Sequence, residues 1–335
     1  MTEGPREITY VAAIAEGIRT VLAEQPNSFA AGEDIGQAGG VFGHFRGLQA
    51  EFGVDRVVDT PISESGIVGL GVGSAATGCR PIIDIMFMDF IAECMDEIAN
   101  QLAKMRYMFG GKAKLPVTVL TMAGAGASMA AQHSQSLEAW LAHLPGLKVV
   151  MPATPGDAKG LIIGAARDDN PVVVIMLKTL LRLRGAVPEA SYATPIGKAS
   201  IVREGRDLTV VCWGRMVHES VKAADVLGEL GVDCEVVDAR SLQPLDTETI
   251  VRSVTKTHRA IVVHESVRIG GLGGEVAAQI QELAFDYLDA PVSRVGAPFC
   301  PVPFSPALES VYVPKADLIA SAAKSLIGIG SGVSG

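Results

Sequence analysis

The sequence predicts an α/β protein with two domains, each built on a parallel β-sheet. Short runs rich in Val and Ile recur along the chain, and segments of helical length separate them. The 335 residues suit two domains. Between residues 180 and 197 the periodicity stops and two prolines appear. We therefore expect a first domain at 1–185, a linker at 186–200, a second domain at 201–328 and a disordered tail at 329–335.

Hydrophobic periodicity places the individual elements. In the first half we expect strands at 28–31, 56–58, 81–87, 116–121, 147–151 and 171–177. Helices are expected at 9–23, 47–52 and 66–77, and from Thr154 onward, where Pro155 and Asp157 complete a helix start. One long helix is expected at 90–109. In the second half we expect strands at 208–212, 234–238, 260–263 and 292–295, and helices at 216–230, 247–255, 274–288 and 317–326.

The composition excludes some classes of partner. Lys and Arg number 28 against 37 Asp and Glu, and the net charge of −9 argues against nucleic acid or an anionic membrane. The five cysteines are scattered without a CxxC spacing, so neither a zinc site nor a disulfide framework is expected. The polar N-terminus predicts no signal peptide, and no apolar window is long enough to span a membrane. We expect a cytoplasmic protein.

Glu64 stands at a turn between a predicted strand and a predicted helix. Pro61 and Ser63 mark this turn. Ligands bind at such corners in open parallel sheets, although a carboxylate there is also an ordinary stabilising charge at a helix N-terminus. Position alone favours the ordinary role. The glycines at 66, 69, 71 and 73 leave one helix face without side chains, so another helix or a cofactor must pack close to that face.

His133 is a second candidate. It follows a Gly-rich loop after a strand, and its flanks carry no charge before Glu138, which is unlike a solvated surface. A lone loop histidine is more often a surface residue. A Ser-His-Asp triad is unsupported, because no G-x-S-x-G segment exists. His264, which with Glu265 follows the strand at 260–263, is a weaker candidate because it lies in the other domain.

The glycine-rich motifs are weak evidence for dinucleotide or phosphate binding. Gly71-x-Gly73-x-x-Ala76 resembles a dinucleotide fingerprint, but its glycines fall inside the predicted helix and no acidic residue ends the next strand. It is the only support for a nicotinamide-dependent oxidoreductase, which stays an alternative. The segment at 110–113 lacks the residues of a phosphate loop. No Gly-Asp-Gly segment, which would hold magnesium diphosphate, occurs in the sequence.

Taken together, several segments resemble the β subunit of the thiamin-diphosphate-dependent E1 component of 2-oxo acid dehydrogenase complexes. The resemblance runs from about residue 6 to residue 327 and includes Gly-Glu-Asp-Ile-Gly at 32–36, Asp-Thr-Pro-Ile-Ser-Glu at 59–64 and Gln-His-Ser-Gln-Ser-Leu-Glu-Ala-Trp at 132–140. The segment 104–114 looks most like the acetoin dehydrogenase branch, with pyruvate dehydrogenase subunits close behind. The resemblance implies a transketolase-like pyrimidine-binding domain followed by a transketolase C-terminal-like domain.

The resemblance also implies roles for matching residues. Glu64 would bond N1′ of the aminopyrimidine of thiamin diphosphate and favour its imino tautomer, a task that suits a buried Glu with a raised pKa. Phe90 would stack on the pyrimidine ring, and Ile62 would be a further cofactor contact. His133 would face the reacting carbon and assist acyl transfer to a lipoyl group. The positions Val117, Ala165, Ala166, Asp168 and Asn170 match a structural potassium site, although residues 168–170 also read as a polar turn after a helix.

Four positions depart from the family pattern. Thr121 stands where an arginine is common, and Asp84 replaces a usual glutamate. Met176 and Leu181 replace a usual glutamate and tyrosine. These changes put the substrate's identity in doubt but leave Glu64, Phe90 and His133 in place.

The expected function is the β half of an α2β2 E1 enzyme. That enzyme would cleave acetoin, or decarboxylate a 2-oxo acid such as pyruvate, and pass the acyl group to the lipoyl group of E2. The partner E1 α subunit would hold the diphosphate and Mg²⁺, because this chain has no Gly-Asp-Gly segment. Besides the nicotinamide alternative, a non-catalytic assembly subunit with the same fold remains open; the intact Glu64, Phe90 and His133 argue against it.

Overall fold

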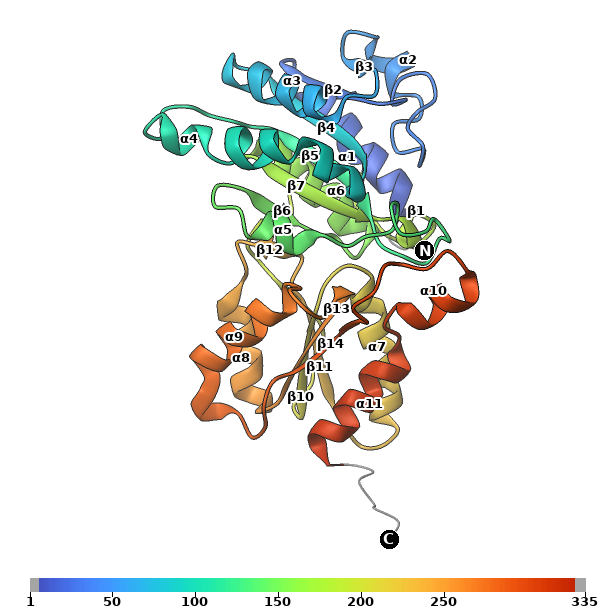
Figure 1. Cartoon of the computed structure of the whole chain (residues 1–335), viewed down its shortest axis with the longest axis vertical. Coiled ribbons are helices and arrows are strands. Elements are labelled where there is room, and N and C mark those ends of the chain that lie inside the picture. Colours follow the sequence, from blue (N-terminus) through green and yellow to red (C-terminus); the bar gives the residue numbers. More distant parts are fainter. Residues whose placement is uncertain (1–5, 329–335) are drawn as a thin grey trace, which may run out of the picture.

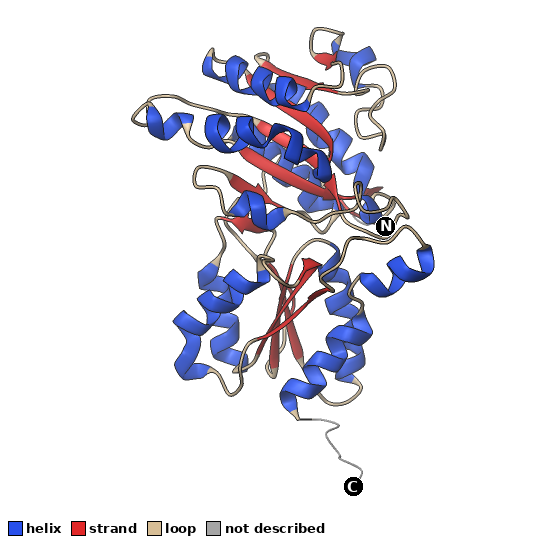
Figure 2. Ribbon diagram, in the orientation of Figure 1, coloured by secondary structure: helices blue, strands red, loops and turns tan. Residues whose placement is uncertain are grey.

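The computed structural model describes residues 6–328 and contains two main β-sheets, each flanked by helices (Figure 1). The larger sheet has the strand order β12-β6-β7-β5-β4-β2-β3, and the smaller has the order β14-β13-β10-β11-β9. Helices cover both faces of each sheet (Figure 2). The predicted α/β class with two sheet domains is confirmed. The predicted disordered tail at 329–335 lies outside the described residues.

The strands of the larger sheet are near-continuous apolar runs, as expected for strands buried on both faces. They are β2 (Ser28–Gly32), β3 (Val57–Asp59), β4 (Arg80–Phe87), β5 (Thr118–Ala123), β6 (Lys148–Val150) and β7 (Val172–Leu177). Their helices are α1 (Tyr10–Glu24), α2 (Leu48–Phe52), α3 (Glu64–Ala76), α5 (Glu138–Ala142) and α6 (Pro155–Arg167). Thr9 and Thr154 cap α1 and α6 as predicted.

The prediction of one long helix at 90–109 is wrong. The chain forms a 3₁₀ helix at Met88–Cys94, a π-helix at Glu97–Leu102 and a short α4 at Met105–Met108. The spacing of the buried residues accounts for the first piece. Met88, Ile91 and Cys94 are buried at every third position, which matches the three residues per turn of a 3₁₀ helix.

The smaller sheet is formed by the second half of the chain. Its strands are β9 (Ser200–Arg203), β10 (Leu208–Cys212), β11 (Cys234–Asp238), β13 (Ala260–Val267) and β14 (Ser293–Ala297). The helices are α7 (Arg215–Gly228), α8 (Thr247–Thr257), α9 (Gly273–Ala284), α10 (Pro306–Tyr312) and α11 (Ala316–Ile327). The sequence did not predict β9 or α10. The domain limits at 185 and 200 stay a prediction.

Both main sheets end in an antiparallel strand, which corrects the purely parallel expectation. β9 pairs antiparallel with β11. β12 (Ser241–Gln243), from the second half of the chain, pairs antiparallel with β6 in the larger sheet. A further small sheet joins β1 (Glu7–Thr9) to β8 (Arg184–Ala186), inside the segment where the linker was expected to begin.

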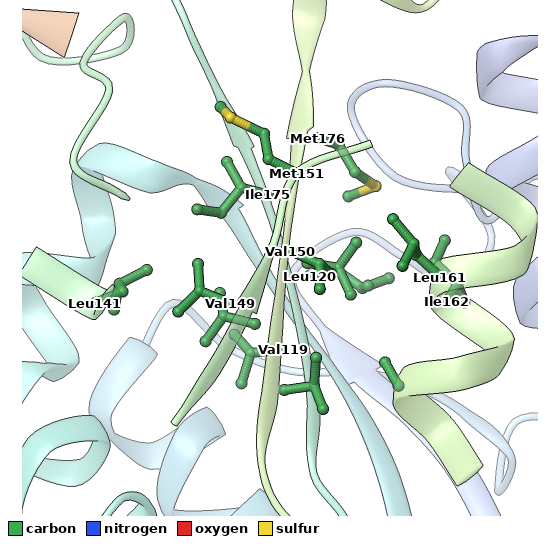
Figure 3. Close-up of a cluster of buried hydrophobic side chains, with 14 of the residues drawn as sticks. Val119, Leu120, Leu141, Val149, Val150, Met151, Leu161, Ile162, Ile175 and Met176 are labelled. Carbon is green, nitrogen blue, oxygen red and sulfur yellow. The ribbon is translucent and has the colours of Figure 1, made fainter. Parts of the chain in front are cut away.

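The core of the first domain lies on both faces of the larger sheet. In Figure 3, Leu161 and Ile162 of α6 lie on one side of the strands and Leu141 of α5 lies on the other. The α1 helix packs on α6, and its Tyr10 hydroxyl donates to the Pro152 carbonyl at 2.9 Å. On the opposite face α3 packs against β4. Within residues 6–328, no helix is long and apolar enough to cross a bilayer.

The glycines of α3 differ in what surrounds them. A Cβ atom at Gly71 would lie 2.8 Å from Cγ1 of the buried Ile83, whereas a Cβ at Gly73 would meet no atom within 4 Å. We expect Gly71→Ala to lower the free energy of unfolding by about 1–3 kcal/mol through overpacking. Gly73→Ala should leave it unchanged or raise it by up to about 1 kcal/mol, because alanine favours a helix. Urea unfolding of both variants tests this; equal destabilisation would contradict the assigned packing.

Candidate active site

Five neighbouring parallel strands bring their carboxyl ends to one edge of the larger sheet. Along the sheet their order is β7, β5, β4, β2 and β3. The residues that follow these strands are, in the same order, Lys178, the loop of His133, Phe90, Glu33 and the turn before Glu64. Such an edge is the usual ligand-binding position of an open parallel sheet. The residues predicted for catalysis and cofactor binding therefore belong to one edge of the larger sheet.

Phe90 and His133 lie next to each other. Their ring centroids are 5.4 Å apart, with the ring planes close to perpendicular. The buried Phe87 contacts both, at 5.3 Å from Phe90 and 4.8 Å from His133. Phe90 and His133 are both half-buried, so part of each ring remains accessible. The sequence named these two residues separately, and the fold brings them together.

Hydrogen bonds fix the segments that carry these two rings. The buried Asp89, beside Phe90, accepts from the Gln135 side chain at 2.9 Å and from the Gln135 backbone amide at 3.2 Å. The buried Lys178 ammonium donates to the His133 carbonyl and lies 5.4 Å from the centre of the Phe87 ring. Burial lowers the pKa of Lys178 to about 8. Asp89 and Lys178 were missed by the sequence analysis, although Lys178 directly follows a predicted strand and Asp89 lies two residues after one.

Glu64 is the first residue of α3 and is half-buried, so the expected full burial is not found in this chain alone. Its neighbour Ser65 donates to the Glu93 carbonyl at 2.6 Å, which ties the start of α3 to the 3₁₀ segment that carries Phe90. Burial, together with the charge of Glu64, raises the pKa of Glu33. Two carboxyl groups therefore lie near this corner, and Ile62 is 83% exposed beside them.

The residues proposed for potassium gather at the turn that ends α6. Asp168 Oδ1 accepts from the Asn170 side chain at 2.7 Å, and the Val117 carbonyl accepts from the Val172 amide. Arg80 donates to the carbonyls of Ala166, at 2.9 Å, and Asp168, at 2.6 Å. Lys148 contacts the Asp168 carboxylate and, despite partial burial, holds its pKa below the ordinary value. Two cationic side chains thus already supply positive charge to these oxygens, which opposes a bound cation.

Three of the four departures from the family pattern are buried in the strands. Thr121 lies in β5 and Met176 in β7. Asp84, in β4, is paired with the buried His44, whose Nε2 lies 3.0 Å from Oδ1. This His44–Asp84 pair was not predicted. Leu181 packs partly buried against the core. None of the four lies between Phe90 and His133.

The dinucleotide-like glycines do not form a nucleotide-binding turn. Gly71 and Gly73 lie well inside α3, and Gly71 packs on the sheet. A dinucleotide fingerprint needs its glycines in the turn before the helix, where the backbone approaches the pyrophosphate. The structure therefore removes the single feature that supported a nicotinamide-dependent oxidoreductase.

The fold and the site define a protein of the transketolase type. Residues 6–184 match the transketolase pyrimidine-binding domain and residues 197–319 match the transketolase C-terminal domain. A solved structure described as a split-gene transketolase, inactive β4 tetramer, has a TM-score of 0.77 with this chain. It is 24% identical in sequence, and the alignment covers 96% of this chain and 99% of that one, so it supports the fold alone.

Two named relatives narrow the class. The chain is 47% identical over 329 residues to the β subunit of acetoin:2,6-dichlorophenolindophenol oxidoreductase from Cupriavidus necator, covering 95% of this chain and 97% of the relative. It is also 47% identical over 322 residues to the β subunit of the pyruvate dehydrogenase E1 component from Bacillus subtilis, covering 96% and 99%. The chain belongs to the family of E1 β subunits of acetoin and pyruvate dehydrogenase complexes, as the resemblance implied.

Proposed function

We propose that this chain is the β subunit of an α2β2 E1 enzyme that cleaves acetoin, or oxidatively decarboxylates a 2-oxo acid such as pyruvate. The enzyme would then transfer the acyl group to the lipoyl group of an E2 acyltransferase. The observation that carries this proposal is the meeting of Phe90 and His133 at the sheet edge that also carries Glu64. The two named relatives have equal identity to this chain, so they do not separate acetoin from pyruvate.

The pyrimidine half of thiamin diphosphate would lie between these residues. Bound there, the cofactor supplies the carbon nucleophile that adds to the substrate carbonyl. Phe90 offers a partly exposed ring for stacking, and the exposed Ile62 is a further contact. The Glu64 carboxyl group would bond the ring nitrogen N1′ and hold a proton there. Its half-buried position leaves it accessible to a ring that enters from outside this chain.

The α partner would complete the site. The sequence has no Gly-Asp-Gly segment, and residues 6–328 contain no cluster of three His, Cys, Asp or Glu side chains able to hold a metal ion. We assign the Mg²⁺ and the diphosphate to the α subunit. The open glycine face of α3 and the exposed Tyr107, Met108 and Phe109 are candidate contact surface. The five free cysteines fit a reducing cytoplasm. A potassium ion near Asp168 stays a prediction, opposed by Arg80 and Lys148.

The Glu64→Gln variant tests the role at N1′. It keeps the size of the side chain but cannot hold a proton as a carboxyl group does, so turnover by the assembled enzyme should fall by roughly 10²–10⁴-fold. Glu51→Gln, at a surface ion pair with Arg19, is the matched control and should remain active. Near-normal turnover with Glu64→Gln would rule out the role, and would favour the assembly-subunit alternative.

The His133→Ala variant separates cofactor binding from acyl transfer. We expect thiamin diphosphate to bind with nearly unchanged affinity, while transfer to a lipoyl domain falls by at least about 10²-fold, since His133 would face the reacting carbon rather than hold the pyrimidine ring. Binding is measured by tryptophan fluorescence and transfer by acetylation of the lipoyl domain. His143→Ala, at the exposed end of α5, is the control. An equal loss of binding and transfer would make His133 structural.

The two-subunit site is tested by expressing the chain with and without its α partner. The lone chain should bind thiamin diphosphate poorly, remain inactive and self-associate through its exposed apolar surface. The assembled enzyme should bind one cofactor per α/β pair and act on acetoin or a 2-oxo acid. Calorimetric titration with Mg²⁺ and thiamin diphosphate, followed by assays on both substrates, decides the matter. Tight stoichiometric cofactor binding and turnover by the lone chain would contradict a site shared by two subunits.

A further inference from the structure

We propose that Glu309, in the second domain, is a positioning residue: its carboxylate fills an anion-binding nest in the backbone loop 124–130 and thereby holds His133 beside Phe90. The catalytic consequence rests on the function proposed above. The contact itself does not, because it is a feature of this chain alone.

The loop has an unusual backbone. Every second residue has a positive φ angle: Gly124 at 93°, Gly126 at 101°, Ser128 at 53° and Ala130 at 61°. A positive φ costs glycine little, but it strains the backbone at Ser128 and Ala130, whose Cβ atoms disfavour it. Such alternation turns successive N–H groups toward one side and makes a concavity that binds anions. A strained loop of this kind persists only where its surroundings hold it.

Glu309 provides the anion. Its Oε1 accepts from the Gly126 amide at 2.7 Å, and its Oε2 accepts from the Ser128 amide at 2.9 Å and from the Ser128 hydroxyl at 3.4 Å. The side chain is 3% exposed, so water competes little for these bonds. Hydrogen bonds to an ionised, buried acceptor are among the stronger ones in proteins. Glu265, in β13, adds a bond from the Ala125 amide to its Oε1 at 2.6 Å.

Packing leaves a space beside this loop. A cavity of about 320 Å³ borders it, and both Ala125 and Ala131 line the cavity wall together with Phe299 and Tyr312. The loop therefore has room to relax if the carboxylates release it. Three of its amides, at residues 125, 126 and 128, are bonded to glutamates that lie at least 140 positions away in the sequence.

The position of His133 depends on anchors at both sides. Downstream, Gln135 is bonded to Asp89, and Lys178 donates to the His133 carbonyl. Upstream, Glu309 is the anchor with the most bonds to the loop. Without Glu309, the stretch from Gly126 to His133 is still held at its start by the bonds of Gly124 to the Gln135 carbonyl and of Ala125 to Glu265, but the bonds at Gly126 and Ser128 are lost. A shift of about 1 Å in a reacting group is enough to lower turnover by roughly 10²-fold.

The test compares Glu309→Gln and Glu309→Ala with wild type in the assembled α2β2 enzyme. We expect kcat for lipoyl acetylation to fall by about 10–100-fold. KM and the Kd of thiamin diphosphate should stay within about twofold, because neither Glu64 nor Phe90 is touched. The matched control is Glu219→Gln, a buried glutamate of the same domain that accepts from the Ala316 amide at 3.1 Å and makes no contact with the loop. It should leave kcat unchanged even where it lowers the melting temperature.

Chemical rescue separates positioning from general stability. Glu309→Ala leaves the nest without its anion. Added formate should therefore raise the kcat of this variant by at least about tenfold, whereas formamide, which is neutral and of similar size, should not. Failure of formate to rescue, together with unchanged kcat in Glu309→Gln, would overturn the proposal.

Hydrogen exchange tests the contact without any substrate. The amides of Gly126 and Ser128 should exchange at least about tenfold faster in Glu309→Gln than in wild type or in Glu219→Gln. If the assembled wild-type enzyme acts on neither acetoin nor pyruvate, the proposed function fails. Hydrogen exchange still decides whether Glu309 holds the loop 124–130. Unchanged exchange at both amides would overturn the proposal, and so would faster exchange with undiminished kcat.

Discussion

The parallel register of β2, β3, β4, β5 and β7 is the constraint on which the site depends. Gly32 at the end of β2 pairs with Asp59 of β3 and with Asp84 of β4, so the three strands deliver their next residues to the same edge. A slip of one residue would turn every side chain of a strand to the opposite face. Most side chains of β2, β4, β5 and β7 are buried on both faces, so a slip would force both faces to repack against their neighbours.

Local patterns predicted most of this framework and part of the site. The apolar runs located the strands of the larger sheet that carry the site, and the turn chemistry around Pro61 and the uncharged flanks of His133 singled out two site residues. Phe90 came only from the resemblance, because an aromatic residue after a strand looks like any core residue. The helix at 90–109 was misjudged because its buried residues begin with a period of three, and β9 and β12 are too short to show an alternation.

The residues that the sequence could not supply are those whose partners are remote along the chain. Glu309 looks like an ordinary surface acid until the fold buries it against loop 124–130, and Glu265, named only beside the weaker candidate His264, gave no sign of its bond to that loop. Burial raises the pKa of Glu265 to about 7. Glu138 accepts from the Trp213 indole at 3.3 Å, again across the two domains. The contact between the domains thus relies on buried carboxylates as well as apolar packing, and a single sequence gives no signal for such pairs.

The placement of β12 has a consequence for how the chain is made. The strand lies in the second half of the sequence but completes the larger sheet beside β6. During synthesis, the first domain would emerge with the edge of β6 still unpaired, and exposed edges invite pairing with other chains. A fragment that ends near residue 185 would lack β12 and keep that edge open. The two halves are therefore interdependent in folding, and a genetic division of the chain near residue 185 would separate a sheet from its own last strand.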